Sequence, residues 1–146
     1  MFVSQGDIFN GRGYSIVVYN MTPHTVTLFN KYYEGRNAKY KRTVLDFCKF
    51  TPKRMVTLGN VQVSENDTGK LLVYERDLNM TDYVLPKSYE GVGFTFDTES
   101  IVVIGRIETD INSIKDLEDY EHYTVASVLH NNYSFALPHH FSLEVK

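Results

Sequence analysis

The clearest pattern of apolar positions lies between residues 14 and 29, where two β-prone runs flank a proline-containing break. Tyr14–Tyr19 and Thr25–Phe29 are rich in Val, Ile, Tyr, Phe and Thr, which suit a pleated, half-buried surface. Val26 and Leu28 alternate with their neighbours at the period of a strand that has one covered face. Because the proline in Asn20–His24 cannot donate a ladder hydrogen bond, the break is predicted to lie at a strand end or edge.

Runs rich in β-branched and aromatic residues predict further strands, separated by turns that contain Gly, Asn, Asp or Pro. The predicted strands are Ala38–Phe50, Met55–Val63, Lys70–Tyr74, Phe94–Phe96 and Ile101–Ile107. The turns expected between them include Asn30–Asn37, Ser64–Gly69 and Asp97–Ser100. The apolar residues of Ala38–Phe50 keep neither a helical nor a strand period, and its β-branched and aromatic content favours a strand.

The last third of the chain carries the one good helix signal. Asp110 or Asn112 is placed to cap a helix over about Ser113–Tyr123, with acidic residues in its first turns as the helix dipole prefers. Tyr123–Leu129 is apolar enough for a buried strand or a short helix, and its periodicity does not decide between them. Residues 139–146 are expected to form a tail or a final strand.

Together these elements predict an α+β fold, mainly antiparallel β-sheet with one or two short helices in the C-terminal third. A single domain is expected over residues 1–146, with residues 1–13 as an N-terminal arm. The positions predicted to form its core are Ile16, Val18, Val26, Leu28, Val44, Leu72, Val102, Ile104, Val125 and Val128.

The composition narrows the class of protein. The single cysteine, Cys48, excludes an internal disulfide and lies in an apolar run, which favours a buried structural thiol over a reactive one. The N-terminus lacks the pattern of a signal peptide, and no apolar run approaches the roughly 20 residues that a membrane-spanning helix needs. We therefore expect a cytoplasmic protein that has no membrane partner and no cofactor.

Charge is distributed unevenly along the chain, although its formal sum is only −3. Residues 31–54 hold eight basic side chains against two acidic ones, and residues 97–121 hold eight acidic side chains against two basic ones. This asymmetry favours either an anionic ligand on the basic side or complementary contacts between subunits, and hence a homo-oligomer. DNA binding is disfavoured because the total charge is negative and the basic segment is short.

The basic segment also carries aromatic residues. Lys31–Arg36 and Lys39–Arg42 interleave Lys and Arg with three tyrosines, which offer cations for phosphate and rings for stacking. A solvated hairpin face explains the same pattern without a ligand.

Two separated stretches resemble a known family. Tyr19–Val26 (YNMTPHTV) is similar to the N-[LM]-T-P-H-x-[VI] opening of small β-rich proteins encoded by phages and prophages. Tyr123–Leu129 (YTVASVL), followed by Phe135 and Pro138, resembles the Y-x-V-[SA]-S segment of their C-terminal halves, and Leu85–Gly91 resembles their central Leu-Pro segment. The Arg-Asp…Gly segment with which the family usually ends is missing, since residues 139–146 contain no Arg.

Such proteins are loosely similar to phage sponge proteins that sequester nucleotide signals of bacterial immunity, such as the cyclic ADP-ribose signals of Thoeris. The resemblance implies a phage-encoded anti-defence protein, in the host-cell cytoplasm, that binds a small phosphorylated nucleotide without cleaving it. The side chains that we predict to bind this ligand are Phe29, Tyr32, Arg36, Arg42 and Arg106, with His24 behind them.

Three alternatives use other chemistry or none. His122–Val125 (HYTV) resembles the His-hydrophobic-Thr-hydrophobic tetrad of two-histidine phosphoesterases, which would make His24, His122 and Thr124 catalytic. His24–Thr27 departs from that tetrad because its hydroxyl falls one residue late, on the opposite face of a strand. His24 can instead bond backbone groups and fix the Thr-Pro-His break. A third possibility is a protein-interaction module that blocks a host factor.

No metal is predicted, since His130 and His139-His140 have no suitably spaced carboxylate in the sequence.

Overall fold

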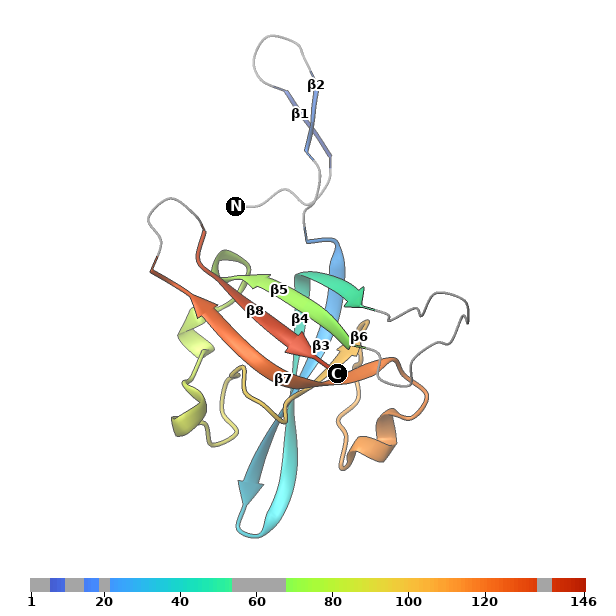
Figure 1. Ribbon diagram of the computed structural model, residues 1–146, viewed down its shortest axis with the longest axis vertical. Coiled ribbons are helices and arrows are strands. Elements are labelled where there is room, and N and C mark those ends of the chain that lie inside the picture. Colours follow the sequence, from blue (N-terminus) through green and yellow to red (C-terminus); the bar gives the residue numbers. More distant parts are fainter. Residues whose placement is uncertain (1–5, 10–14, 19–21, 54–67, 134–137) are drawn as a thin grey trace, which may run out of the picture.

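The runs of β-branched and aromatic residues form strands of two separate sheets. The computed structural model describes residues 6–9, 15–18, 22–53, 68–133 and 138–146. One sheet pairs β1 (Gly6–Phe9) with β2 (Ser15–Val18). The other is a closed antiparallel barrel of β3 (His24–Glu34), β4 (Asn37–Lys53), β5 (Thr68–Tyr74), β6 (Ile101–Ile104), β7 (His122–Asn131) and β8 (His140–Val145). The strand order is β3-β4-β5-β8-β7-β6, and pairing of β3 with β6 closes the barrel (Figure 1).

The prediction of a mainly antiparallel β protein is confirmed, and the predicted α-helices are wrong. The described residues contain only short 3₁₀ turns: η1 (Glu75–Asp77), η2 (Met80–Asp82), η3 (Pro86–Ser88) and η4 (Ile114–Leu117). The expected helix Ser113–Tyr123 is reduced to η4, in which only Leu117 is buried. The residues that follow it, Glu118 to Glu121, are mostly acidic and would oppose the dipole at a helix C-terminus. None of the helices in the described ranges is long and apolar enough to cross a membrane.

Tyr123–Leu129 belongs to strand β7, and the end of the chain is strand β8 and not a tail. Phe94–Phe96, predicted as a strand, has only one isolated bridge, between Phe94 and Tyr83. The strand predicted over Ile101–Ile107 ends at Ile104, before a glycine turn. The predicted strand Met55–Val63 lies outside the described residues.

The barrel interior is filled by one hydrophobic cluster, to which every strand of the barrel contributes. Its members are Val26, Leu28, Leu45, Cys48, Phe50, Leu71, Val73, Phe94, Phe96, Val102, Tyr123, Val125, Phe141, Leu143 and Val145. Four predicted core residues are among them, and Ile104 and Val128 pack against the cluster while partly buried. Val44 and Leu72 are only half-buried, because the neighbouring Leu45, Leu71 and Val73 face the interior instead. The side chains of the predicted core residues Ile16 and Val18 lie outside the described part.

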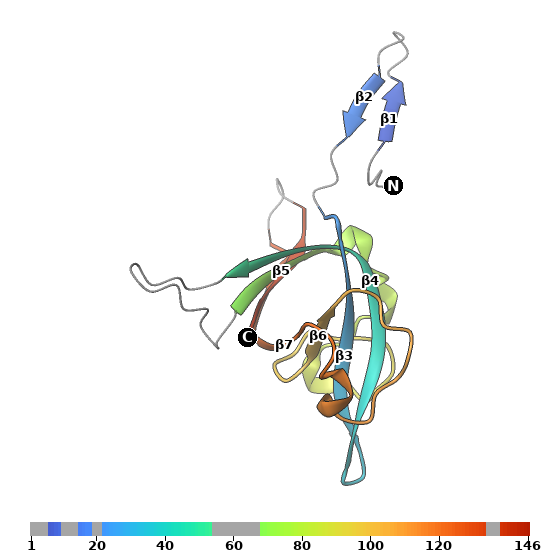
Figure 2. The ribbon, with the colours of Figure 1, turned by 90° about the vertical axis from the view of Figure 1, so that its right-hand side faces the viewer.

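A second cluster lies on the outer face of β3 and β6. The segment between β6 and β7 folds back over this face (Figures 1 and 2), and its apolar side chains cover the strands. The members are Phe29, Ile101, Val103, Ile107, Ile111 and Leu117, with Tyr40 packed against them. The hydroxyl of Thr27 fastens the start of this segment, donating to the Gly105 carbonyl at 2.8 Å and accepting from the Ile107 N–H at 2.8 Å.

The hairpin of β3 and β4 is longer than the barrel. β6 pairs with β3 only over Val26–Phe29, and β5 pairs with β4 only over Lys49–Lys53. Among the described strands, residues 30–42 therefore form a two-stranded ribbon with no further strand on either edge, and its end projects from the barrel in Figure 2. We call this segment the hairpin ribbon. It contains most of the predicted basic and aromatic residues.

Candidate functional site

A cavity of about 450 Å³ lies along the β4 side of the hairpin ribbon. The side chains that determine its chemistry are Tyr32, Lys39, Tyr40, Lys41, Arg42 and Asp110. Its lining thus combines three basic side chains with one carboxylate and two tyrosines. We call it the basic cavity. Its volume is in the range of small-molecule sites, about 300–1,000 Å³.

Strand alternation explains how the cations reach the basic cavity from both faces of the ribbon. Lys39 and Lys41 pair with Tyr32 and Asn30, whereas Arg42 pairs with Phe29 on the outer face. The Arg42 Nε donates to Asp110 Oδ1 at 3.2 Å, and its Nη1 donates to the Ile107 carbonyl at 3.3 Å. These bonds use two of the five N–H donors of the guanidinium and fix its position.

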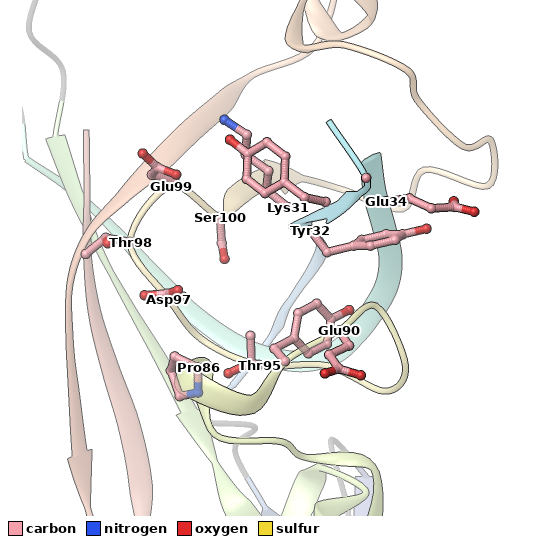
Figure 3. Close-up of a pocket in the computed structure, with 13 residues that line it drawn as sticks. Lys31, Tyr32, Glu34, Pro86, Glu90, Thr95, Asp97, Thr98, Glu99 and Ser100 are labelled. Atoms are coloured by element: carbon pink, nitrogen blue, oxygen red, sulfur yellow. The ribbon is translucent and has the colours of Figure 1, made fainter. Parts of the chain in front are cut away.

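The β3 side of the hairpin ribbon bounds a larger cavity of about 660 Å³, shown in Figure 3. Four carboxylates line it, those of Glu34, Glu90, Asp97 and Glu99, against the single ammonium of Lys31. We call it the acidic cavity. Its charge makes it unsuited to phosphate, although it is the larger of the two.

Tyr32 lines both cavities, and the loop after η3 holds its ring in place. Tyr89 makes an edge-to-face contact with the Tyr32 ring, with centroids 6.5 Å apart. Gly91, at φ 96°, lies so close that an added Cβ would be 2.7 Å from this ring. A glycine is therefore required there, both for its backbone conformation and for the approach to Tyr32.

The structure brings together only part of the predicted ligand-binding set. Tyr32 and Arg42 line the basic cavity, while Arg36 lies at the exposed tip of the hairpin ribbon. Arg106 is half-exposed and forms an ion pair with Asp46. The prediction that Phe29 binds the ligand is corrected, because its side chain is fully buried in the outer cluster and cannot stack on a ligand base.

His24 serves the structural role that we gave as its alternative. Its Nδ1 accepts a hydrogen bond from the Phe50 N–H at 2.9 Å, at the point where β3 begins beside β4. This bond satisfies a backbone donor at a break in the β3–β4 ladder, where the register shifts between His24 and Val26. His24 lines neither of the two cavities.

The structure does not assemble the residues of a two-histidine phosphoesterase. His122 lies across β6 from Thr27, two strands away from β3. With His24 three residues further along β3, standard strand dimensions put the two Cα atoms about 14 Å apart. Because Tyr123 and Val125 face the barrel interior, His122 and Thr124 point outward from β7.

The histidines of the opposite barrel end meet a carboxylate that the sequence did not reveal. Glu75 Oε2 lies 3.4 Å from His130 Nε2 and 3.3 Å from His139 Nδ1, and the Glu75 N–H donates to the His139 carbonyl. His139 is thus part of the folded barrel end. Even so, no group of three or more His, Cys, Asp and Glu side chains in the described residues is arranged to hold a metal ion.

Comparison with protein families gives a match over most of the chain. Residues 21–145 match DUF6751, a family of unknown function. The chain belongs to this family. No curated protein and no solved structure matches the chain.

Sequence reasoning about this DUF6751 protein missed the parts of the site that come from elsewhere in the chain. Asp110 orients Arg42 from 68 residues away, and Tyr89 and Gly91 hold Tyr32 from the loop after η3. The alternation of the hairpin ribbon shows which side chains share a face, but not which loop returns to cover it. The only available signal was the acidic 97–121 segment, which is complementary to the basic one.

Proposed function

We propose that this DUF6751 protein binds a small phosphorylated nucleotide in the basic cavity and sequesters it without cleavage. One observation carries the proposal: Lys39, Lys41 and Arg42 line a cavity that is also lined by tyrosines and by one carboxylate among the described residues. A sponge needs affinity alone, so this set is sufficient for the proposed role.

Phosphate would be held by charge and by directed donors. Arg42, already oriented by Asp110 and Ile107, has up to three N–H donors for phosphate oxygens. Lys41 and Lys39 add mobile charge, and the Lys39–Glu34 ion pair at 3.4 Å is exposed on both sides and therefore weak. The free-energy cost of exchanging Glu34 for a phosphate as the partner of Lys39 is therefore small.

Tyr32 is the ring best placed to stack on a base, because Tyr89 and Gly91 fix it at the wall of the cavity. Stacking on an aromatic ring contributes about 1–3 kcal/mol per base and tolerates different bases. The Thr-Pro-His and Tyr-x-Val-Ala-Ser resemblances support a phage origin, action in the host-cell cytoplasm, and a signal of bacterial immunity as the nucleotide.

The test is calorimetric titration with cyclic ADP-ribose isomers and cyclic dinucleotides, followed by denaturation and chromatography of the nucleotide. We expect tight binding and recovery of the nucleotide intact. A cleaved product would instead support the phosphoesterase. If every nucleotide fails to bind, the proposal is wrong, and a pull-down from host lysate then tests the protein-interaction alternative.

Two lysines of β4 provide a matched pair of variants. Lys41 lines the basic cavity, whereas Lys49 is exposed further along the same strand, beside β5. Lys41→Gln should weaken binding by about 10-fold or more, as expected for loss of one charged hydrogen bond. Lys49→Gln should leave the affinity nearly unchanged. Equal effects of both variants would indicate nonspecific attraction and not a site.

A further inference from the structure

A smaller cavity of about 300 Å³ adjoins the basic cavity along β4. Lys41 and Arg42 line both of them, so the two cavities meet at these neighbouring cations. The rest of the lining comes from β4 and from the segment between β5 and β6: Thr43, Asp82, Gly93 and Phe94. We call it the side cavity. A ligand that enters the basic cavity and contacts its two shared cations is therefore next to a second space.

The backbone after β5 builds the wall of the side cavity. β5 pairs with β4 only over Lys49–Lys53, so a loop segment, in place of a strand, borders β4 here. The Phe94 N–H donates to the Asp82 carbonyl at 3.0 Å, and the Val84 N–H donates to the Phe94 carbonyl at 2.9 Å. Gly93 has φ 77°, and an added Cβ there would clash with the Asp82 carbonyl oxygen. These contacts fix the backbone of Asp82 in the wall.

One oxygen of the Asp82 carboxylate is left for a ligand. Asn79 Nδ2 donates to Asp82 Oδ2 at 3.0 Å, and the Thr81 N–H orients this amide by donating to Asn79 Oδ1 at 3.3 Å. Among the described residues, none donates a hydrogen bond to Asp82 Oδ1, and the side chain is exposed. A carboxylate accepts hydrogen bonds only, and Asp or Glu binds ribose hydroxyls in this way in dinucleotide sites.

From the two adjoining cavities we infer that the nucleotide of the proposed function carries a second sugar, which lies in the side cavity. This inference rests on the proposed function. Lys41 and Arg42, which the cavities share, hold the pyrophosphate between the two halves of the ligand. The base half lies against Tyr32 in the basic cavity, and Asp82 Oδ1 accepts hydrogen bonds from the hydroxyls of the second sugar. The ligand class is thus a nucleoside diphosphate sugar.

Neither a further phosphate nor a second base matches the side cavity as well as a sugar does. A phosphate there would be repelled by the carboxylate of Asp82. A second base would gain no stacking surface from Phe94, because this ring is 4% exposed and packs in the barrel core. A neutral group with several hydroxyls avoids the repulsion and satisfies the carboxylate.

The test is calorimetric titration of the full chain with ADP and with ADP-ribose, which has an additional ribose beyond the pyrophosphate. We expect ADP-ribose to bind about 10-fold more tightly or more, as hydrogen bonds to a charged group contribute. If these two and the cyclic nucleotides all fail to bind, the proposed function is wrong and this inference falls with it. If ADP binds at least as tightly as ADP-ribose, or only a compact cyclic nucleotide binds, this inference alone is wrong.

Asp82→Asn and Asp119→Asn form a matched pair, because each removes one exposed charge and only Asp82 lines the side cavity. Asp82→Asn should weaken ADP-ribose binding about fivefold or more. The same variant should leave ADP binding unchanged or tighter, because the lost charge repels phosphate. Asp119→Asn should change either affinity less than about twofold.

The opposite response of the two ligands separates a sugar contact from general electrostatics. Removal of a negative charge near a phosphate site would by itself strengthen the binding of both ligands. ADP binding also shows that Asp82→Asn is folded. An unchanged affinity for ADP-ribose, or equal changes for both ligands, would overturn the assignment of Asp82 to the second sugar.

Discussion

At the scale of single residues, Cys48 shows what burial does to chemistry. Its side chain is fully buried between strands of the barrel, as the sequence predicted. Burial raises the pKa of the thiol well above its usual range, and the negative charges of Asp77 and Asp46 add to the shift. A reagent therefore cannot reach the sulfur atom in the folded protein, and the thiol stays protonated at ordinary pH.

We expect Cys48 to react with a thiol reagent such as DTNB at pH 8 only when the protein unfolds. The measurement compares the labelling rate in buffer with the rate in denaturing urea, where one thiol per chain should react at once. Stoichiometric labelling of the native protein within seconds would contradict the burial of this side chain.

Asp77 is a nearly buried carboxylate with little compensation. Its side chain is 5% exposed, Arg76 Nε is 4.0 Å away, and Oδ2 has no hydrogen bond from any described residue. Burial raises the pKa of Asp77, and Arg76 offsets part of that shift. A carboxyl whose pKa is higher in the folded state than in the unfolded chain favours the fold only while it is protonated. This contribution is complete at a pH below the pKa of the unfolded chain, about 3.9. That contribution is lost as the pH rises through the folded pKa.

Asp77→Asn should therefore raise the free energy of unfolding at pH 7, and its advantage over the parent should shrink as the pH falls below about 4. Urea unfolding at pH 3.5, 5 and 7 measures the difference. Asp82→Asn, at an exposed position nearby, is the control and should show no such pH-dependent gain. A loss of stability at pH 7 would mean that the carboxylate of Asp77 has a favourable role.

At the scale of elements, Asn30 connects β3 to the loop that forms the floor of the acidic cavity. Its side chain is 1% exposed, and Nδ2 donates to the Thr95 carbonyl at 2.7 Å and to Ser100 Oγ at 3.1 Å. Its Oδ1 accepts from the Thr95 N–H at 3.1 Å. Among the hydrogen bonds of the described residues, these three join the loop to β3 and help to define its position.

Asn30→Ala should lower the free energy of unfolding by about 2–4 kcal/mol, because it removes three buried hydrogen bonds and leaves their partners unsatisfied. Asn30→Asp keeps the acceptor but buries a charge, so it should be more destabilising at pH 7 than at pH 4. Urea unfolding measures both variants. A change below about 0.5 kcal/mol for Asn30→Ala, the size of an ordinary surface substitution, would show that the loop is held by other contacts.

Breaks in strand register explain where sequence reading of the elements fell short. β4 advances three residues, from Leu45 to Cys48, while β3 advances two, from Val26 to His24. The inward-facing positions therefore change phase at this point, which is why Ala38–Phe50 showed no clean period. The predicted core residue Val44 lies on the outward phase, and Leu45 takes the inward one.

The same effect made Tyr123–Leu129 ambiguous. β7 has one extra residue between Val125 and Ser127, so Tyr123 and Val125 face inward before the break, and Val128 and His130 do so after it. The inward-facing residues are thus two and then three positions apart, and over a short segment this resembles the spacing of one face of a helix. The composition and the turn residues were enough to predict that strands and the hairpin ribbon exist. The points at which the inward-facing positions shift by one residue depend on partner strands far away in the sequence.

The candidate site was predictable to the extent that it is local. Tyr32 and Arg42 lie on one hairpin, and the basic-aromatic pattern found them. Phe29 was misassigned because a side chain on a predicted strand gives no sign of whether a later segment covers it. Here the segment with Ile107 and Leu117 does so.

At the scale of the whole molecule, the opposite charges of the 31–54 and 97–121 segments meet within one chain. Arg42 of the basic segment pairs with Asp110 of the acidic one, whereas the Arg106–Asp46 pair joins the minority charge of each segment. The Arg42–Asp110 pair, at the surface of one chain, therefore neutralises part of the asymmetry that favoured a homo-oligomer. Charge beyond these pairs remains on the surface, including Lys41 and Lys49 on β4 and Glu118 and Asp119 after η4.

An assembly held by that remaining surface charge must be sensitive to salt, because exposed charges are screened beyond about 10 Å at 0.1 M ionic strength. We predict a homodimer or larger assembly at micromolar protein in roughly 20 mM salt, with the mass falling towards that of one chain at about 0.5 M salt. Light scattering coupled to gel filtration measures both states. A monomer mass at low salt would refute self-association through the remaining surface charge. An assembly that survives high salt would show that apolar contacts, not charge, hold the subunits together.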